Sequence, residues 1–205
     1  VYTDSDPFSQ PEVEELTKIS STSAAAIGFD GRIWMTYNTG EKWHRVMDPV
    51  GRWGVGWDIH FPTPGVGYAV GRLGLIFKSN DAGQTWRQIS NGAARDILDI
   101  EVRSNGLGLA VGDDGLVLRT TDFGRTWTAK QLRDPNYYSH ISEINTVEFV
   151  DDNTVILGGS VGSVYRSDNA GVDWTKLAEF GGNAEVLDTH FVDKNTGWVA
   201  GILNS

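Results

Sequence analysis

Apolar residues in this chain fall into short stretches, and in several of these stretches apolar and polar residues alternate. The alternating stretches lie at 57–61, 98–102, 145–149 and 187–191; the second reads Leu-Asp-Ile-Glu-Val. A period of two places successive side chains on opposite faces of a β-strand. We therefore expect four strands with one face buried at these ranges.

Each alternating stretch is followed by a second, mostly apolar stretch, at 67–70, 108–111, 155–158 and 197–200, and another copy lies at 24–27. A Gly-x-x-Gly pair follows every one of these copies except 197–200, at Gly28/Gly31, Gly71/Gly74, Gly112/Gly115 and Gly159/Gly162. Further short strands are predicted at 75–77, 116–118 and 163–165, and at 87–89, 128–130 and 175–177. The one weak sign of a helix is Pro11 to Thr17.

Between the third and fourth predicted strands the chain repeats an eight-residue phrase, Ser/Thr-x-Asp/Asn-x-Gly-x-x-Trp. Successive copies end at Trp43, Trp86, Trp127 and Trp174, which are 43, 41 and 47 residues apart. The pattern positions are Thr36, Asn38, Gly40, Trp43, Ser79, Asp81, Gly83, Trp86, Thr120, Asp122, Gly124, Trp127, Ser167, Asn169, Gly171 and Trp174. A fixed period of this length indicates a repeat architecture.

The chemistry of the phrase favours a structural role over a catalytic one. Hydroxyl and carboxylate side chains at its first and third positions can bond nearby backbone N–H groups in a turn. Its glycine allows a positive φ, and its tryptophan supplies a large apolar anchor. We interpret the phrase as a hairpin between two strands of each repeat.

These residues resemble the Asp-box (BNR) repeat, which occurs in sialidases, sortilin-type receptors and photosystem II stability and assembly factors. The wider pattern around Gly67–Gly71 and Leu75–Ser79 is most similar to the photosystem assembly factor family. The resemblance covers about residues 18–205. It implies an all-β protein, a β-propeller of four-stranded antiparallel blades, and it implies a role in holding partner proteins during complex assembly.

The repeats give a domain division. We expect an N-terminal linker at 1–17 and a propeller at 18–205, with repeats at about 18–50, 55–92, 96–133 and 143–180 and a partial fifth at 185–205. The fifth copy supplies only two strands, so the chain is interpreted as part of a larger or incompletely represented propeller. An alternative is that N-terminal strands complete the last blade and so close the propeller, but the sequence of residues 1–10 is poorly suited to a strand.

Charge and composition restrict the classes of molecule that this chain is expected to bind. The formal net charge is −10, with 27 acidic and 17 basic residues, which disfavours nucleic acid and acidic membranes. There is no cysteine, which excludes disulfides and thiolate sites. No apolar stretch is long enough to span a bilayer. Localisation stays open: extracytoplasmic or in the thylakoid lumen for an assembly factor, or in a virion for the alternative below.

The sequence lacks the motifs that a sialidase or a serine hydrolase would carry. Arg32 lies in a segment without the proline that sialidases carry there, and Gly158–Gly162 lies between strands rather than before the helix that a nucleophile elbow needs. His60, Glu101, Glu148 and His190 share one repeat position, where a metal site is possible but polar channel residues are favoured. We predict no catalytic residue, no metal and no cofactor.

Two groups are candidates for binding a partner. Lys78, Arg119 and Arg166 occupy one repeat position and could form a basic rim, and two longer loops carry Arg52 with Trp53 and Tyr137 with Tyr138. Exposed aromatic and arginine side chains often anchor interfaces. The sequence favours a non-catalytic scaffold that binds other protein subunits, without nucleic acid or membrane insertion. The alternatives are a phage or virion accessory module and a glycan-directed propeller, either lectin-like or hydrolase-like.

Overall fold

The computed structural model describes residues 13–48, 56–133, 143–181 and 183–203, and within them the strands form four four-stranded sheets and one two-stranded sheet. We number these sheets blades 1 to 5 in chain order. Blade 1 holds β1 (Val13–Lys18), β2 (Ala24–Gly28), β3 (Ile33–Thr36) and β4 (Trp43–Met47). Blade 2 holds β5 (Gly56–Thr63), β6 (Val66–Gly71), β7 (Ile76–Ser79) and β8 (Arg87–Ile89).

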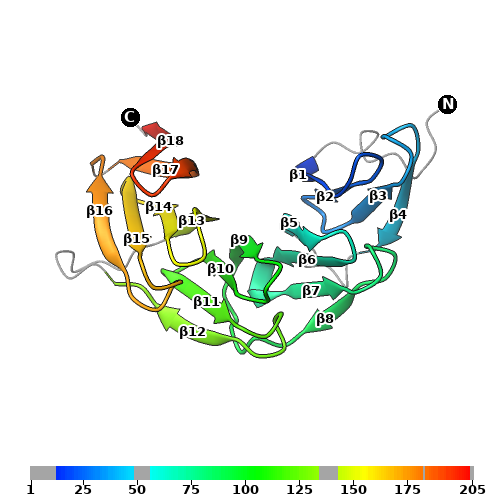
Figure 1. Cartoon of the computed structure of the whole chain (residues 1–205), viewed down its shortest axis with the longest axis horizontal. Helices are drawn as coiled ribbons and strands as arrows, with labels where there is room; N and C mark the ends of the chain where they lie inside the picture. Colours follow the sequence, from blue (N-terminus) through cyan, green and yellow to red (C-terminus); the bar gives the residue numbers. More distant parts are fainter. Residues whose placement is uncertain (1–12, 49–55, 134–142, 182, 204–205) are drawn as a thin grey trace.

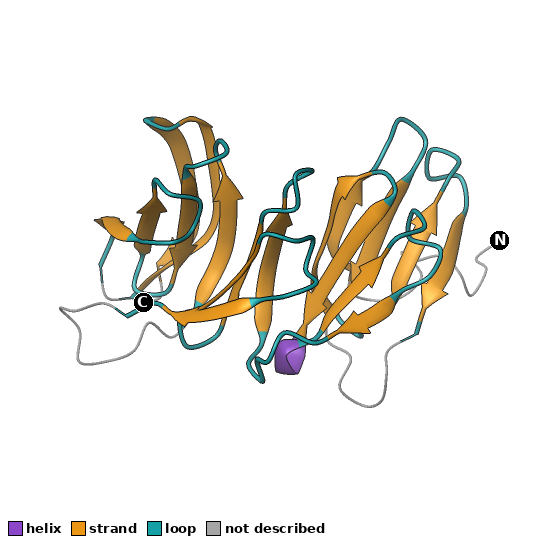
Figure 2. Ribbon diagram, turned by 60° about the horizontal axis from the view of Figure 1, so that its bottom comes forward, coloured by secondary structure: helices purple, strands orange, loops and turns teal. Residues whose placement is uncertain are grey.

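Blade 3 holds β9 (Ile97–Val102), β10 (Gly108–Gly112), β11 (Leu116–Thr120) and β12 (Thr128–Gln131). Blade 4 holds β13 (Ile144–Phe149), β14 (Val155–Gly159), β15 (Ser163–Ser167) and β16 (Thr175–Glu179), and blade 5 holds β17 (Ala184–Asp193) and β18 (Thr196–Leu203). All described strand pairs are antiparallel and join neighbours in sequence. Within the described residues, one 3-10 turn, η2 (Arg72–Gly74), lies between β6 and β7 (Figure 2).

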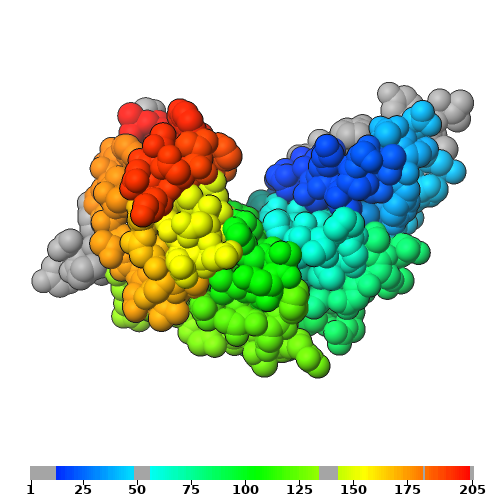
Figure 3. Space-filling model, viewed as in Figure 1, coloured from blue at the N-terminus to red at the C-terminus, as the bar shows by residue number. Residues whose placement is uncertain are grey.

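The blades stand side by side along an arc, as Figure 1 shows, with blade 1 and blade 5 at its two ends. The first strand of every blade lies on the inner side of the arc, and the fourth strands of blades 1 to 4 lie on the outer side. Neighbouring first strands contact one another from β1 to β5, β9, β13 and β17. The space-filling view in Figure 3 shows the same succession of packed blades. These features confirm the predicted propeller of four full repeats and a partial fifth.

The middle strands of blades 2 to 4 are apolar on both faces because a neighbouring blade covers each face. In β10, Leu109 and Val111 pack toward blade 4, whereas Ala110 between them packs toward blade 2. All three are fully buried. A strand buried on both faces has no reason to alternate polar and apolar residues, so continuous apolar stretches occur at these positions.

The Gly-x-x-Gly pairs meet two separate needs. A Cβ atom on Gly112 would collide with the carbonyl oxygen of Asp96, where the start of β9 lies against the end of β10. The second glycine sits in the following hairpin turn, where Asp114 and Gly115 both have positive φ, 57° and 65°. Two successive positive φ values match the turn that suits the right-handed twist of a hairpin.

The predicted linker at 1–17 is wrong over its last part, and so is the weak helix sign at Pro11 to Thr17. Val13–Lys18 is strand β1, which pairs with β2 as the first strand of blade 1. Glutamates favour a helix in isolation, but strand pairing with the apolar β2 decides the conformation here. Within the described residues, no helix has the length and apolar character to cross a membrane.

Candidate functional site

The Asp-box turns form a hydrogen-bonded unit made of their own residues. In blade 3, the Thr120 hydroxyl donates to Asp122 Oδ1 (2.9 Å) and accepts from the Gly124 N–H (2.9 Å). Asp122 also accepts from the Thr126 N–H (2.9 Å) and from its hydroxyl (2.6 Å). These bonds lower the pKa of Asp122 to about 2, with the Thr126 hydroxyl as the largest cause. The carboxylate is therefore committed to the turn and is not free to act as an acid or base.

The other copies use the same geometry with small changes. Asn38 replaces aspartate in blade 1, and its side-chain oxygen accepts from the Thr36 hydroxyl and from the Lys42 N–H, each at 3.0 Å. Asn169 accepts from the Asp173 N–H at 2.8 Å in blade 4. Trp86 donates its indole N–H to the Gly83 carbonyl at 3.0 Å. All of these contacts stay inside a single hairpin.

A second set of polar side chains ties neighbouring blades together near the axis. The Ile100 N–H donates to Asp58 Oδ2 (3.0 Å), and the Val147 N–H donates to Asp99 Oδ2 (2.7 Å). In each case a carboxyl group on one first strand accepts a backbone hydrogen bond from the next first strand.

The four residues that share one repeat position take part in the same scheme. His60 Nε2 bonds the Val102 carbonyl (2.9 Å), the Phe149 N–H donates to Glu101 (2.7 Å), and the Phe191 N–H donates to Glu148 (2.8 Å). His190 lies 3.5 Å from Glu148. Within the described residues, no three or more histidine or acidic side chains are placed to hold a metal ion. These side chains join blades rather than surround one point.

The basic residues at the third-strand position also reach from one blade to the next. Lys78 Nζ donates to the Phe123 carbonyl (2.7 Å), and Arg119 Nε donates to the Ala170 carbonyl (2.7 Å). Phe123 and Ala170 occupy the same position in the Asp-box turns of blades 3 and 4. Arg166 bonds Asp168 and the Lys194 carbonyl. We call the contacts of Lys78 and Arg119 the inter-blade struts.

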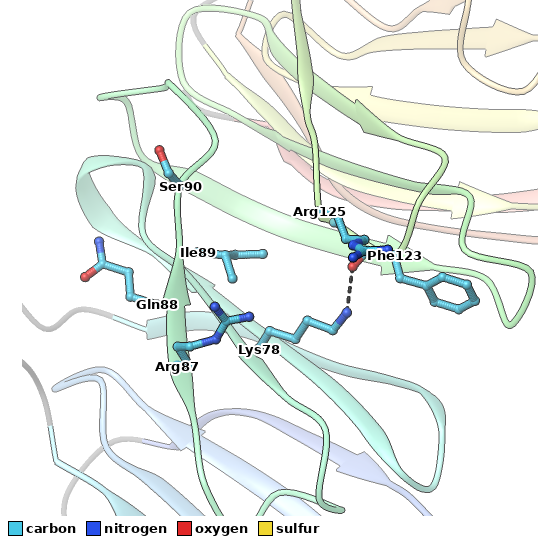
Figure 4. A pocket seen from close by; sticks show the side chains of 8 residues that line it. Lys78, Arg87, Gln88, Ile89, Ser90, Phe123 and Arg125 are labelled. Atoms are coloured by element: carbon cyan, nitrogen blue, oxygen red, sulfur yellow. Dashed lines mark hydrogen bonds between the residues drawn. The ribbon is translucent and has the colours of Figure 1, made fainter.

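Of these three cations, Lys78 also lines a cleft of about 450 Å³ between blades 2 and 3. The cleft is lined by Lys78, Arg87, Gln88, Ile89, Ser90, Phe123, Gly124 and Arg125. Figure 4 shows Arg87 on the blade 2 side, Arg125 and Phe123 on the blade 3 side, and the Lys78 bond between them. We call it the inter-blade cleft.

The cleft is strongly basic for a chain with a net charge of −10. Its lining contains three cations and no carboxylate. Within the described part of the chain, the side chains of Arg87 and Arg125 make no hydrogen bond or ion pair, whereas those of Arg72, Arg95 and Arg103 each pair with an aspartate.

The three charges also act on one another. Burial lowers the pKa of Lys78, and the like charges of Arg87 and Arg125 add to this effect, against the opposing charge of Asp122. Phe123 adds an apolar ring that is 38% exposed. The cleft therefore offers two free guanidinium groups, a bound ammonium and an aromatic surface to a ligand.

The sequence pointed to only part of this arrangement. Arg52, Trp53, Tyr137 and Tyr138 lie outside the described residues. Arg87, Phe123 and Arg125 were not singled out, although Arg87 follows an Asp-box tryptophan and the other two occupy variable positions of an Asp-box. Their grouping requires knowing which turn of blade 3 faces which strand of blade 2.

Comparison with protein families gives a match over most of the described chain. The family described as "Photosynthesis system II assembly factor YCF48" matches residues 35–182. The photosystem II assembly protein Ycf48 of Thermosynechococcus vestitus is 36% identical over 70 residues, which cover 29% of this chain and 20% of that protein. The chain thus matches about a fifth of this curated relative's length.

Solved structures show the same fold at low identity. YCF48 from Cyanidioschyzon merolae has a TM-score of 0.71 and 18% identity, over 99% of this chain and 70% of that one. A structure described as YCF48 bound to D1 peptide has a TM-score of 0.53 and 13% identity, over 99% and 93% of the two chains. An ancestral GH74 enzyme reaches 0.70 with 17% identity over 82% of this chain and 24% of that one.

Proposed function

Because this chain belongs to the YCF48 family of photosystem II assembly factors, we propose that it is a non-catalytic propeller that binds a segment of another protein during the assembly of a larger complex. The inter-blade cleft is the proposed binding site. The observation that carries this assignment is the pair of unpartnered arginines, Arg87 and Arg125, gathered with Lys78 around one recess.

A cleft of this composition fits an extended protein segment that carries carboxylates. Arginine pairs with carboxylates through two parallel hydrogen bonds, and an exposed ring beside it accepts an apolar side chain. A structure of a YCF48 is described as bound to D1 peptide, which shows a peptide ligand for that protein. This supports a peptide as the class of ligand for the present chain.

Several features support binding without catalysis. The Asp-box carboxylates are committed to their own turns, and the residues at the shared position of β5, β9 and β13 bond the next blade. The likeness to a GH74 enzyme is at 17% identity and concerns the fold alone. The virion and glycan alternatives receive no specific support from the comparisons.

The test is a binding titration with a fluorescein-labelled D1 peptide of the kind named for the relative. The wild-type chain is compared with the double variant Arg87→Ala/Arg125→Ala. We expect the double variant to bind at least about tenfold more weakly, because two charge-assisted contacts are lost. Wild-type binding should also weaken with added salt, since the cleft is open to solvent.

The matched control is Arg72→Ala/Arg103→Ala, which removes two arginines that already pair with Asp96 and Asp152. This control should bind as the wild type does. Equal weakening by both pairs of substitutions would show a general charge effect and would reject the cleft. Failure of the wild-type chain to bind the peptide, while retaining its fold, would count against the proposed ligand class.

A further inference from the structure

The inner side of the arc contains a cavity of about 540 Å³ that is lined by carboxylates from four blades. Glu15, Asp58, Asp99 and Asp188 project from β1, β5, β9 and β17, and we call them the axial carboxyl cluster. The strand pairing places all four at one register position, opposite Ile27, Val70, Val111 and Ala200 respectively. The remaining lining residues, Trp57, Leu98, Asn145, Thr146 and Leu187, carry no charge.

Two members of the cluster are in direct contact. The side chains of Asp58 and Asp99 hydrogen-bond to each other across the boundary between blades 2 and 3. An ionised carboxylate has only acceptors, so a bond between two carboxyl groups requires a proton on one of them. Both Asp58 oxygens also accept from the backbone, Oδ1 from the Ile59 N–H and Oδ2 from the Ile100 N–H, and Asp99 Oδ2 accepts from the Val147 N–H.

We propose that a proton shared by Asp58 and Asp99 holds the axial ends of blades 2 and 3 together, so that this seam tightens in acid and loosens as the pH rises. The proton supplies the donor that the two carboxyl groups lack. Its loss leaves two negative charges facing each other across β5 and β9, in a recess whose described lining residues include no cation. The proposal is independent of the inter-blade cleft.

The surroundings of the pair explain why the proton is retained. Burial raises the pKa of Asp58 well above its usual value, and the charges of Asp99 and Glu15 raise it further. Burial also raises the pKa of Asp99. His60 and Glu101 also interact electrostatically with Asp99, but burial lowers the pKa of His60 and raises that of Glu101 to about 7. From β13 and β17 the neighbours are Thr146 and Asp188, so none of the described strands around the pair brings a fixed positive charge to it.

The raised pKa values of the two aspartates determine how stability changes with pH. A carboxyl group with a raised pKa in the folded state binds more protons folded than unfolded at intermediate pH. Stability from this pair is therefore complete below the usual aspartate pKa and is lost as the pH rises through the raised pKa. The equilibrium constant for opening the β5–β9 seam should rise about tenfold for each pH unit in that interval and then level off.

The first experiment is a carbon-13 NMR titration of the aspartate carboxyl groups in the whole chain. We expect Asp58 or Asp99 to keep its proton well above the ordinary aspartate range, with the shift of its partner changing in the same step. Titration of both groups in the ordinary range would overturn the proposal.

The second experiment follows hydrogen exchange of the Ile100 amide, which donates to Asp58, with correction for the pH dependence of intrinsic exchange. Protection in the wild type should fall by about tenfold per pH unit over the interval above. Asp99→Asn supplies a side-chain N–H donor that does not titrate and keeps both Asp58 oxygens as acceptors for Ile59 and Ile100, so its Ile100 protection should be nearly independent of pH. Asp58→Asn tests the same point from the other partner, although it loses one of the two backbone acceptors.

The control is Asp188→Asn, at the same register position in β17 and exposed. It removes one charge from the cluster but leaves the bonded pair, so the steep pH dependence of Ile100 protection should persist. An unchanged pH dependence in both Asp58→Asn and Asp99→Asn would reject a shared proton.

Discussion

Thr120 shows how one side chain can fix a whole turn. It is 1% exposed, and its hydroxyl donates to Asp122 while accepting from the N–H groups of Asp122 and Gly124. A buried N–H that loses its acceptor has no water to replace it, so it costs the full desolvation penalty. Residues of this kind explain why hydroxyls recur at the first Asp-box position.

Thr120→Val keeps the shape of the side chain and removes the hydroxyl. We expect it to lower the free energy of unfolding by about 1–3 kcal/mol, the usual cost of leaving a buried donor unsatisfied. Urea denaturation followed by tryptophan fluorescence measures the change. Thr121→Val is the matched control, since Thr121 is exposed. Equal destabilisation by both substitutions would show that the buried hydroxyl has no special role.

Val161 is a residue whose side chain conflicts with its turn. It has a φ of 60° in the hairpin between β14 and β15, where a β-branched side chain is strained. Asparagine adopts this conformation readily and precedes glycine in the favoured hairpin turn. Val161→Asn should therefore raise the free energy of unfolding by about 1 kcal/mol. An unchanged or lower thermal midpoint would contradict this expectation.

At the scale of elements, the blades are joined by regularly repeated contacts rather than by one interface. Carboxyl groups on the first strands bond the next first strand, and the struts bond the next Asp-box turn. In blade 1, Met35 takes the register position of the struts, and its thioether lies against Gly83 of blade 2. The contact between the third strand of one blade and the Asp-box turn of the next is thus made by apolar packing in one case and by a charged hydrogen bond in the others.

Substitution at a strut separates the structural arginines from those proposed to bind a partner. Arg119→Met should lower the free energy of unfolding by about 1 kcal/mol, because the bond to the Ala170 carbonyl is lost. Arg125→Met should change it by less than about 0.5 kcal/mol, since the Arg125 side chain has no hydrogen bond to lose within the described residues. Denaturant titration of both variants provides the comparison. The reverse order would show that Arg125, not Arg119, supports the fold.

At the scale of the whole molecule, two groups of carboxylates oppose each other in their dependence on pH. Hydrogen bonds in the turns lower the pKa values of Asp81, Asp122 and Asp151, so stability from them is lost as the pH falls through their folded pKa values. Burial near the axis raises the pKa of Glu101 to about 7, so stability from Glu101 is lost as the pH rises toward that value.

We therefore expect greatest stability in mildly acidic solution. Urea midpoints measured from acid to alkaline pH should fall on both sides of this maximum, and the decline between the ordinary glutamate pKa of 4.5 and about 7 should be smaller in Glu101→Gln. Glutamine at this position keeps an oxygen for the Phe149 N–H. Stability that rises steadily from pH 5 to 8 in the wild type would contradict this expectation.

The sequence alone determined the blades, because each repeat contains the local signals for its own strands and turns. Alternation marks the first strands, continuous apolar stretches mark the strands buried on both faces, and the glycine and Asp-box phrases mark the turns. These signals are local, and the repeats confirm one another. Val13–Lys18 was missed because its glutamates hide the alternation, and only pairing with β2 makes it a strand.

The tertiary structure decided which side chains meet across blades. Lys78 and Arg87 join Arg125 in one cleft, and Asp58 joins Asp99 at the axis, although about 40 residues separate the partners. These meetings depend on the angle and register at which neighbouring sheets pack. That geometry comes from buried surfaces as a whole and leaves no mark on the short-range pattern of the chain.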